Sequence, residues 1–222
     1  MDTMSIEAQH HPFYPRTLRL PDYVPNTRST FQLLLTVGLV MCAVVSIALA
    51  IIGARKQRSL GQRARFVWFT VSAILHLGFE SYWIYRGHAV ASRSDLLSEL
   101  WKEYAHGDSR YLSVDPVLLA VETITVTIWG PLCVLAALSI WRDSPTQYLW
   151  QLIASMAHLF SCTLYFVLDF PTGFENCDPH PLYFWVYFVA FNSPWILVPA
   201  KLVFDSFRVI STALSVVKTK LD

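Results

Sequence analysis

The sequence has little charge and little glycine for its length. Charged residues make up 15% of the 222 residues, there are 8 glycines, and the formal net charge is only +1. No run of five or six like charges occurs, so the chain has no strongly charged segment that would attract nucleic acid. We therefore expect no nucleic-acid partner.

Motifs that bind cofactors and metals are also missing. The sequence has no glycine-rich phosphate loop, no nucleophile elbow, and no His and Cys residues at a spacing typical of metal ligands. Cys42, Cys133 and Cys162 fall in apolar stretches, and Cys177 has no partner in its loop, which argues against a disulfide framework. No cleavable signal peptide is visible in the polar first thirty residues. We expect no cofactor and no metal.

Apolar residues are abundant instead. They make up 54% of the chain, and aromatic residues make up 14%, which is typical of a membrane protein. A helix needs about 20 apolar residues to cross the hydrocarbon core of a bilayer. Stretches near that length lie at 31–53, 66–85, 117–141, 148–170 and 182–204. The sequence therefore predicts an all-α integral membrane bundle of five transmembrane helices.

The charge of the first connection predicts the orientation in the membrane. The segment GARKQRSLGQRAR contains basic residues and no acidic one, which marks it as cytosolic by the positive-inside rule. A lumenal N-terminal arm (1–30), a five-helix transmembrane domain (31–204) and a cytosolic tail (205–222) follow from this. The tail ends in KTKLD, where Lys218 and Lys220 resemble the dilysine retrieval signal of the endoplasmic reticulum, although two lysines also occur there by chance. We expect the protein in the endoplasmic reticulum membrane.

The connection between the second and third spans predicts a shorter helix. In the segment SDLLSELWKEYAHGDSRY, apolar residues recur at helical spacing, and Ser94 and Asp95 are well placed to cap the helix. We predict a lumenal amphipathic helix that lies on the membrane surface.

A few ionisable residues fall inside the predicted spans, where a charged side chain costs roughly 2.5 to 3.5 kcal/mol. They are His76, Glu80, Glu122, His158, Asp169 and Lys201. Asp169 and Lys201 lie close to span ends and can reach the interface, so structural roles are expected for these two. For His158, a structural and a functional role are equally open.

Four polar side chains fall at two matching depths. His76 and Glu80 are four residues apart and share one face of a helix. At about 1.5 Å of rise per residue, Glu80 and Glu122 each lie about 8 Å inside the lumenal ends of their spans. His76 and Asn192 lie about 14 to 15 Å inside by the same arithmetic. We therefore predict that these side chains meet inside the bundle, and we favour a functional cluster over a purely structural network.

A proline distorts the fifth predicted span beside this cluster. In FNSPW, Pro194 cannot donate a hydrogen bond to the carbonyl of Ala190 and should bend the helix. The bend exposes backbone polarity beside Asn192 and turns Trp195. A pocket can open at such a kink.

The third predicted span carries a similar combination. Glu122, Thr125 and Trp129 share one face of this helix, and Gly130 and Pro131 give a second break next to Trp129. Prolines and tryptophans are ordinary in membrane helices, but here they adjoin a buried carboxyl group.

These residue types favour acid–base chemistry on an apolar substrate. A carboxyl group in lipid-like surroundings resists ionisation and can act as an acid, and a neighbouring imidazole can take or pass the proton. Aromatic faces attract a cation by roughly 2 kcal/mol or more when dry. The candidate faces are Trp195 with Trp129, Tyr104 and Tyr111. Together these groups suit the protonation of an apolar double bond with proton loss elsewhere.

Five segments carry a family resemblance. They read HPFYP with LRLPDYVPN, ILHLGFES, LWKEYAHGDSRY, VETITVTIWGPL and HPLYFWVYFVAFNSPW, and they span nearly the whole chain from His11 to Trp195. Through them the chain resembles the emopamil-binding protein family of sterol Δ8-Δ7 isomerases, within the superfamily that shares the EXPERA domain. The block WKEY-x-x-GDSRY is specific to the superfamily, and ETIT-x-x-x-WGPL favours the isomerases over their relatives.

The resemblance implies a reaction and a set of site residues. A proton adds at sterol C9, a tertiary cation forms at C8, and a proton leaves C7, which shifts the double bond from 8(9) to 7(8). The functional residues of the family map onto His76, Glu80, Glu122, Thr125, Asn192 and Trp195. We expect His76, Glu80 and Glu122 to divide the acid and base roles. The fourth span departs from the family, which often has Gln and Asp where this chain has His158 and Cys162.

The resemblance also implies the partners, and it leaves alternatives open. Expected partners are the sterol substrate, cationic amphiphilic drugs whose ammonium group replaces the carbocation, and the lipid bilayer. The sequence does not fix the oligomeric state, so a homodimer is left open. The main alternative is a non-catalytic protein of the same superfamily that binds sterols or cationic amphiphilic drugs. A proton-coupled transporter is a weaker alternative, because five helices without a repeated half give no basis for alternating access.

Overall fold

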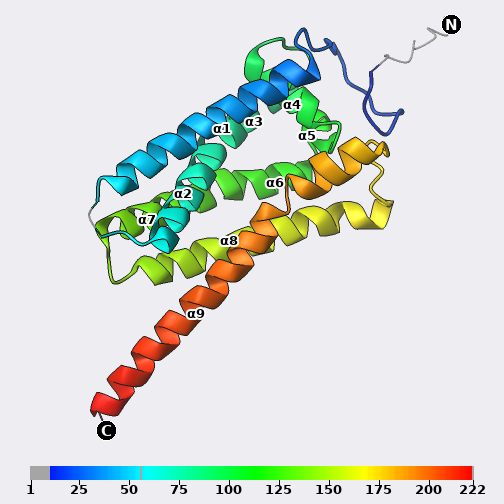
Figure 1. Ribbon diagram of the computed structural model, residues 1–222. Helices are drawn as coiled ribbons and strands as arrows, with labels where there is room; N and C mark the ends of the chain where they lie inside the picture. Colours follow the sequence, from blue (N-terminus) through cyan, green and yellow to red (C-terminus); the bar gives the residue numbers. More distant parts are fainter. Residues whose placement is uncertain (1–10, 56, 222) are drawn as a thin grey trace, which may run out of the picture.

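All regular secondary structure in residues 11–55 and 57–221, which the computed structural model describes, is helical (Figure 1). Residues 1–10 of the N-terminal arm, Lys56 of the basic connection and Asp222 of the tail lie outside the described residues. The elements are α1 (Thr30–Gly53), α2 (Leu60–Ile74), η1 (Leu75–Glu80), α3 (Ser81–Val90), α4 (Leu96–Tyr104), α5 (Arg110–Ser113), α6 (Pro116–Ile124), η2 (Thr125–Trp129), α7 (Gly130–Arg142), α8 (Gln147–Asp169), η3 (Phe170–Thr172), η4 (Leu182–Ala190) and α9 (Pro194–Leu221). The segments η1, η2 and η4 are π-helical.

Four helical stretches are long and apolar enough to cross a bilayer. They are Thr30–Gly53, Pro116–Arg142, Gln147–Thr172 and Leu182–Leu221. The remaining predicted span, 66–85, lies within α2, η1 and α3, which follow one another without a break. It is not one of the four, because polar residues such as His76 and Glu80 lower its hydropathy. The prediction of a helical membrane protein is thus confirmed on four spans.

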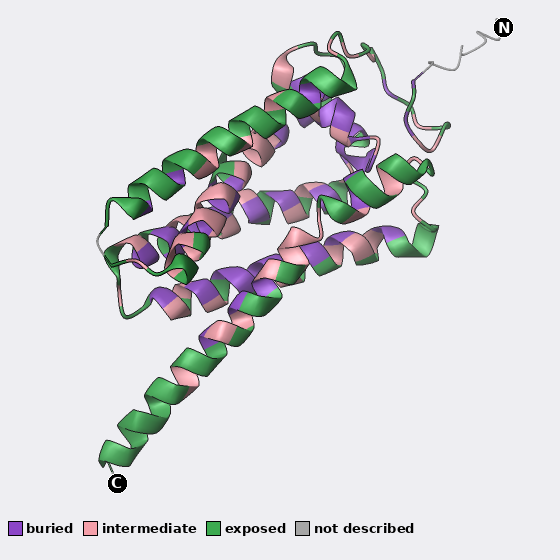
Figure 2. Ribbon diagram, viewed as in Figure 1, coloured by how far each residue is buried: buried purple, intermediate pink, exposed green. Residues whose placement is uncertain are grey.

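The outer surface of the bundle is apolar. Phe31, Leu39 and Ile47 of α1 and Phe204 of α9 are exposed. Figure 2 shows the outward faces of α1 and α9 as exposed along most of their length. A surface this apolar is unfavourable in water and favourable in hydrocarbon, so these faces are suited to contact lipid.

Inside the bundle, α2 packs against α1 and α7, and α8 packs against α7 and α9. The core between these helices contains small buried side chains, among them Ala48, Ala136 and Ala154. Small residues let helices approach closely, which is how membrane helices gain packing energy without a hydrophobic driving force.

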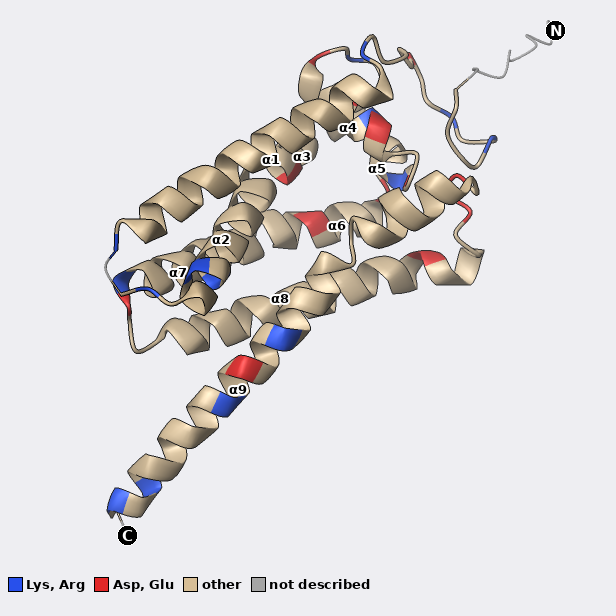
Figure 3. Cartoon of the chain, viewed as in Figure 1, with Lys and Arg blue, Asp and Glu red and all other residues tan. Residues whose placement is uncertain are grey.

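A cap formed by residues 11–28, α4 and α5 covers one end of the bundle (Figure 1). The loop after η3 joins the cap, because Ser109 N donates to Asn176 O at 2.9 Å and Asp178 N donates to His106 O at 3.0 Å. The connection between α1 and α2 lies at the opposite end, where Arg58 pairs with Asp143 at 2.7 Å. The described residues of the segments predicted to be lumenal are therefore at one end, and the described residues of the basic connection are at the other (Figure 3).

The amphipathic helix predicted in the long connection is present as α4. Asp95 caps it as predicted, because its side chain accepts a hydrogen bond from Ser98 N. Its polar face is not open to solvent, because Glu99, Lys102 and Glu103 are buried, and its position on a membrane surface stays a prediction. Residues 24–28 cover that face, and a helical pattern alone does not show that another segment will cover it.

Two charged side chains of α4 hold the N-terminal arm. Both Thr27 N and Thr27 Oγ1 donate to Glu99 Oε1 at 2.7 Å, and Arg28 Nη1 lies 2.9 Å from Glu99 Oε2. Lys102 Nζ donates to Val24 O at 2.6 Å and to Arg93 O at 2.8 Å. Burial of the Glu99 and Lys102 charges is offset because each charged group has several hydrogen-bond partners.

The Glu99 carboxylate contributes stability that depends on pH. Burial alone would raise the pKa of Glu99, but hydrogen bonds from Thr27 and Arg28 outweigh burial and lower the pKa from 4.5 to about 2. Since the folded pKa is below the ordinary value, this stabilisation is complete above pH 4.5 and is lost as the pH falls towards 2.

We expect Glu99→Gln to destabilise the cap at neutral pH by about 1–3 kcal/mol, because an amide nitrogen replaces one of two acceptor oxygens. The thermal unfolding temperature of the detergent-solubilised protein should fall, and proteolysis within residues 11–28 should become faster. Glu175→Gln, in an exposed loop, is the matched control. Equal unfolding temperatures for wild type and Glu99→Gln would contradict this role.

The helix at Pro194 is interrupted rather than bent. The segment η4 ends at Ala190, a turn follows, and α9 begins at Pro194. Proline fits the first position of a helix because its missing N–H would have no partner there. Asn192 therefore lies within a true break between two helices, and Trp195 lies just after that break.

The helix is not broken at Gly130 and Pro131, so this prediction is wrong. The chain stays helical from α6 to α7, and the π-helical segment η2 lies directly before Gly130. A wide π turn removes the conflict that a proline creates with the carbonyl one turn earlier, so the helix continues.

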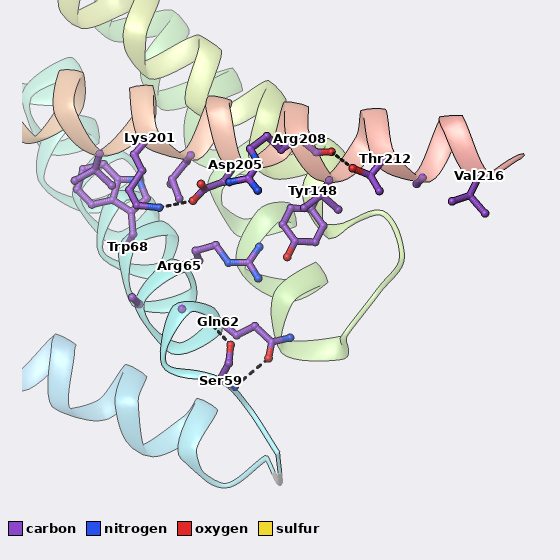
Figure 4. Close-up of a pocket in the computed structure, with 16 residues that line it drawn as sticks. Ser59, Gln62, Arg65, Trp68, Tyr148, Lys201, Asp205, Arg208, Thr212 and Val216 are labelled. Atoms are coloured by element: carbon purple, nitrogen blue, oxygen red, sulfur yellow. Dashed lines mark hydrogen bonds and ion pairs between the residues drawn. The ribbon is translucent and has the colours of Figure 1, made fainter. Parts of the chain in front are cut away.

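The tail continues α9 without a break at the predicted boundary between 204 and 205. Residues 205–221 extend the helix past the end of the bundle (Figure 1), and Lys218 and Lys220 are exposed near its end. Lys201 and Asp205 form an ion pair on the side of a groove of about 820 Å³ between α2, α8 and α9 (Figure 4).

Candidate active site

A cavity of about 440 Å³ lies inside the bundle beside the cap. This volume falls within the range of roughly 300–1,000 Å³ that ligand pockets have. Its lining includes all nine residues predicted for catalysis or cation binding: His76, Glu80, Tyr104, Tyr111, Glu122, Thr125, Trp129, Asn192 and Trp195. The groove of Figure 4 is larger, but none of the nine residues lines it. We place the candidate site in the cavity.

Two π-helical segments bring the polar residues to the cavity. His76 and Glu80 belong to η1, while Thr125 and Trp129 belong to η2. Glu122 lies just before η2, near the end of α6. A π turn widens the helix by one residue and changes the direction of the side chains, and such turns are frequent at functional sites.

Gly130 lets these two segments approach. A Cβ atom at residue 130 would lie 2.6 Å from Leu77 Cδ2, 2.8 Å from Leu77 Cγ and 3.4 Å from His76 Cβ. Any side chain would therefore push η1 away from the start of α7. The absence of a side chain at residue 130 positions His76 deep in the bundle.

His76 forms the centre of a buried polar cluster. Its Nδ1 atom lies 2.9 and 2.8 Å from the two carboxylate oxygens of Glu80, and its Nε2 atom lies 3.1 Å from His158 Nε2. The same His158 nitrogen lies 3.3 Å from Cys133 Sγ. His76 is 4% exposed and His158 is 2% exposed, so both imidazoles are buried in the bundle.

The geometry of this cluster links the protons of its members. With Glu80 ionised, His76 carries a proton on Nδ1 and donates it to the carboxylate. Only one of the two facing Nε2 atoms can then hold a hydrogen, so a proton on His76 Nε2 requires His158 to accept. A change of protonation at one imidazole thus changes the tautomer of the other.

Glu122 forms a second acidic centre on another helix. Tyr111 Oη donates to Glu122 Oε1 at 2.6 Å, and the Glu122 side chain is buried, with 8% exposure. Tyr111 is itself fixed, because Trp83 Nε1 donates to its backbone oxygen at 2.7 Å. The cap therefore supplies a hydroxyl group that holds a carboxyl group of the transmembrane bundle.

Aromatic rings from the cap form one wall of the cavity. Trp101 stacks on Phe79 with ring centroids 4.3 Å apart, and Tyr111 lies 4.7 Å from Trp101. Tyr104 contacts Tyr111 at 5.4 Å. These π faces adjoin the acidic centres, where a developing positive charge would be stabilised.

The break before α9 forms an adjoining wall. Asn192 Nδ2 donates to Tyr104 Oη at 3.1 Å and to Phe188 O at 2.8 Å. Trp195 packs against Trp68 with centroids 5.5 Å apart, and its buried Nε1–H has no hydrogen-bond partner among the described residues. Trp195 is thus a free donor at the cavity.

The remaining predicted residues have structural partners at the site. Trp129 Nε1 donates to Ser161 Oγ at 2.8 Å, and Thr125 Oγ1 donates to Val121 O at 3.0 Å. Asp169, for which a structural role was expected, accepts from Asn176 Nδ2 at 2.6 Å outside the cavity.

Several lining residues were not predicted as part of the site. They are Phe79, Trp101, Ser161 and Tyr165, together with His158 and Cys162, whose roles were left open. Trp101 was visible as an apolar position of an amphipathic helix, but the pattern could not show that this helix covers a cavity. The sequence placed Cys133 only in an apolar stretch, and its contact with His158 depends on two different helices.

The fold and cavity define a class of protein. It is a helical membrane protein with a mostly apolar cavity, in which ionisable side chains from separate helices lie beside aromatic walls.

Comparison with known proteins supplies the family. Residues 96–206 match the EXPERA family, the expanded emopamil-binding protein superfamily. The chain belongs to this family, which confirms the resemblance found in the sequence.

Curated relatives cover nearly the whole chain. The 3-beta-hydroxysteroid-Delta(8),Delta(7)-isomerase of Cavia porcellus is 35% identical over 95% of this chain and 93% of the relative. The protein of the same name from Rattus norvegicus is 34% identical with the same coverage. The protoglabretal synthase of Ailanthus altissima is 30% identical over 92% of this chain and 94% of the relative.

Proposed function

We propose that this protein is a sterol isomerase that moves the ring double bond from 8(9) to 7(8) in sterol biosynthesis. The main observation behind this proposal is that buried ionisable groups from η1 and α6 line one apolar cavity with aromatic walls. The names of relatives that align with 95% of the chain support the same activity.

The acid and base roles are assigned to His76, Glu80 and Glu122. A protonated group adds a proton to C9, the positive charge develops at C8, and a second group removes the proton from C7. Glu122 forms one centre and the His76–Glu80 pair forms the other, because they project from different helices into the same cavity. After turnover the group that gave its proton to C9 must regain one, and the group that took the proton from C7 must release one.

The aromatic residues stabilise the intermediate in this proposal. Trp195 faces the cation, and Tyr104, Tyr111 and Trp129 complete the cation-binding surface, while Thr125 and Asn192 position the sterol. A cationic amphiphilic drug binds in the same cavity because its ammonium group replaces the carbocation.

Turnover in heavy water tests this path. We expect the Δ7 product to carry one deuterium at C9 after each single turnover, because the added proton comes from a solvent-exchangeable side chain. Conversion of zymostenol to lathosterol by the purified protein, followed by mass spectrometry and NMR, measures both activity and label position. The non-enzymatic incubation is the control.

A product without deuterium at C9 would overturn the protonation path. Absence of conversion by folded protein that still binds a cationic amphiphile would instead favour the non-catalytic alternative. The isomerase names of the relatives make catalysis the better supported function.

The placement in the cell is part of the proposal. Five membrane-crossing segments, with 66–85 as the second, put the cap in the lumen of the endoplasmic reticulum and the tail in the cytosol. The basic residues between α1 and α2 and along the tail support this orientation (Figure 3). In this arrangement Lys218 and Lys220 are accessible to a cytosolic retrieval receptor. The homodimer left open by the sequence stays a hypothesis.

A further inference from the structure

We propose that His76, His158 and Cys133 form a binding site for a divalent transition-metal ion, Zn²⁺ in particular, and that the bound ion inhibits the isomerase. Three helical segments supply these residues: η1, α8 and α7. The inhibitory effect rests on the proposed function, whereas metal binding does not.

The distances between the three side chains suit a metal ion. His76 Nε2 and His158 Nε2 are 3.1 Å apart, His158 Nε2 and Cys133 Sγ are 3.3 Å apart, and each residue offers one ligand atom within 4.8 Å of the other two. Tetrahedral Zn²⁺ has bonds of about 2.0–2.3 Å, which puts neighbouring ligand atoms roughly 3.3–3.7 Å apart. The first two distances are within a few tenths of an ångström of this range, and the remaining pair, His76 Nε2 and Cys133 Sγ, lies within 4.8 Å.

The ligand types select the kind of metal. Two imidazoles and one thiolate are borderline to soft donors, which favour Zn²⁺, Co²⁺ and copper over Mg²⁺ and Ca²⁺. Coordination releases the thiol proton of Cys133 to the buffer as the sulfur bonds to the ion, and no oxidation or reduction takes place.

Glu80 supports this site from one position further out. Its carboxylate binds His76 Nδ1 at 2.8 Å, which leaves the Nε2 lone pair of His76 free to coordinate. Carboxylate–histidine–metal arrangements of this kind fix the tautomer and strengthen the bond to the metal. The negative charges of Glu80 and of a Cys133 thiolate also balance the two charges of Zn²⁺, so the buried site is neutral overall.

The bound ion would interfere with the proposed chemistry. Both His76 and His158 line the cavity, so an ion bound to them would lie at the wall of the substrate space. A metal on His76 Nε2 blocks proton transfer through that nitrogen and adds positive charge where the sterol cation must form. Zn²⁺ should therefore lower turnover without needing to unfold the bundle.

Cobalt binding tests the site independently of turnover. Purified full-length protein in detergent is titrated with Co²⁺, and its tetrahedral d–d and thiolate charge-transfer absorption is recorded. We expect about one Co²⁺ per chain, displaced by Zn²⁺. Cys133→Ser and His158→Gln should each weaken Co²⁺ binding by more than roughly 10–100-fold, which is the loss typical for a residue that contacts a metal ligand but not the metal. Cys162→Ser, a buried cysteine of the same cavity outside the cluster, should keep the full signal.

The activity arm uses Zn²⁺ with metal-free protein as reference. We expect Zn²⁺ to inhibit wild type and Cys162→Ser at least about tenfold, with Cys133→Ser retaining its own metal-free turnover under the same conditions. Folded wild type without a thiolate–Co²⁺ band, or an unchanged band in Cys133→Ser, would overturn the site. A normal band with undiminished turnover in Zn²⁺ would overturn the inhibition alone. A band in protein that never isomerises sterols would uphold the site and refute the proposed function.

Discussion

Glu122→Gln is expected to lower the sterol isomerisation rate by about 10²–10⁴-fold, the usual contribution of a general acid or base. The amide is nearly the same size as the carboxyl group and can still accept the hydrogen bond from Tyr111, which is 2.6 Å long in wild type. It cannot release or take up the proton that the reaction needs. The loss should therefore appear in kcat rather than in the folding of the protein.

Two further measurements separate catalysis from structure in this variant. The unfolding temperature should stay close to that of wild type, and a cationic amphiphile should still bind in the cavity. Glu175→Gln removes a carboxylate from an exposed loop and should keep full activity. Near-normal turnover in Glu122→Gln would exclude Glu122 from proton transfer.

The membrane fold was largely predictable because bilayer insertion imposes simple patterns. Apolar length predicted helices that match α1, α8 and the stretch from α6 to α7 within a few residues. The span at 66–85 is less apolar because it supplies His76 and Glu80 to the cavity. The function of that segment therefore weakens the signal that identifies a membrane helix.

The convergence of the site was predictable from depth, since helices have a fixed rise per residue. The calculated depth gives the position of a residue along the membrane normal. It does not give the direction of the side chain around the helix axis or the residues that it contacts. The contact between Cys133 and His158 depends on how α7 and α8 are rotated, and the stacking of Trp101 depends on how the cap folds over the bundle. Such contacts are set by packing between distant segments, which a single sequence does not record.

His76 and Glu80 are expected to act as one coupled unit in catalysis. Their hydrogen bonds of 2.9 and 2.8 Å make them one proton-transfer unit, so removal of either partner should disable the unit. We expect His76→Asn and Glu80→Gln each to lower kcat by about 10²–10³-fold. The kcat of the double variant should be at most about threefold lower than that of the poorer single variant. Once one partner of a coupled pair is removed, removal of the other has little further effect.

Rates for the four proteins of this double-mutant cycle measure the coupling directly. His88→Asn, an exposed histidine further along the same helical stretch, is the control and should retain normal kcat. Losses that multiply in the double variant would show that His76 and Glu80 act at separate steps. In that case Glu80 would act on the sterol itself, and the hydrogen bond to His76 would serve only to position it. His76 and Glu80 must act together if the buried His76 imidazole is to pass protons to and from the Glu80 carboxylate.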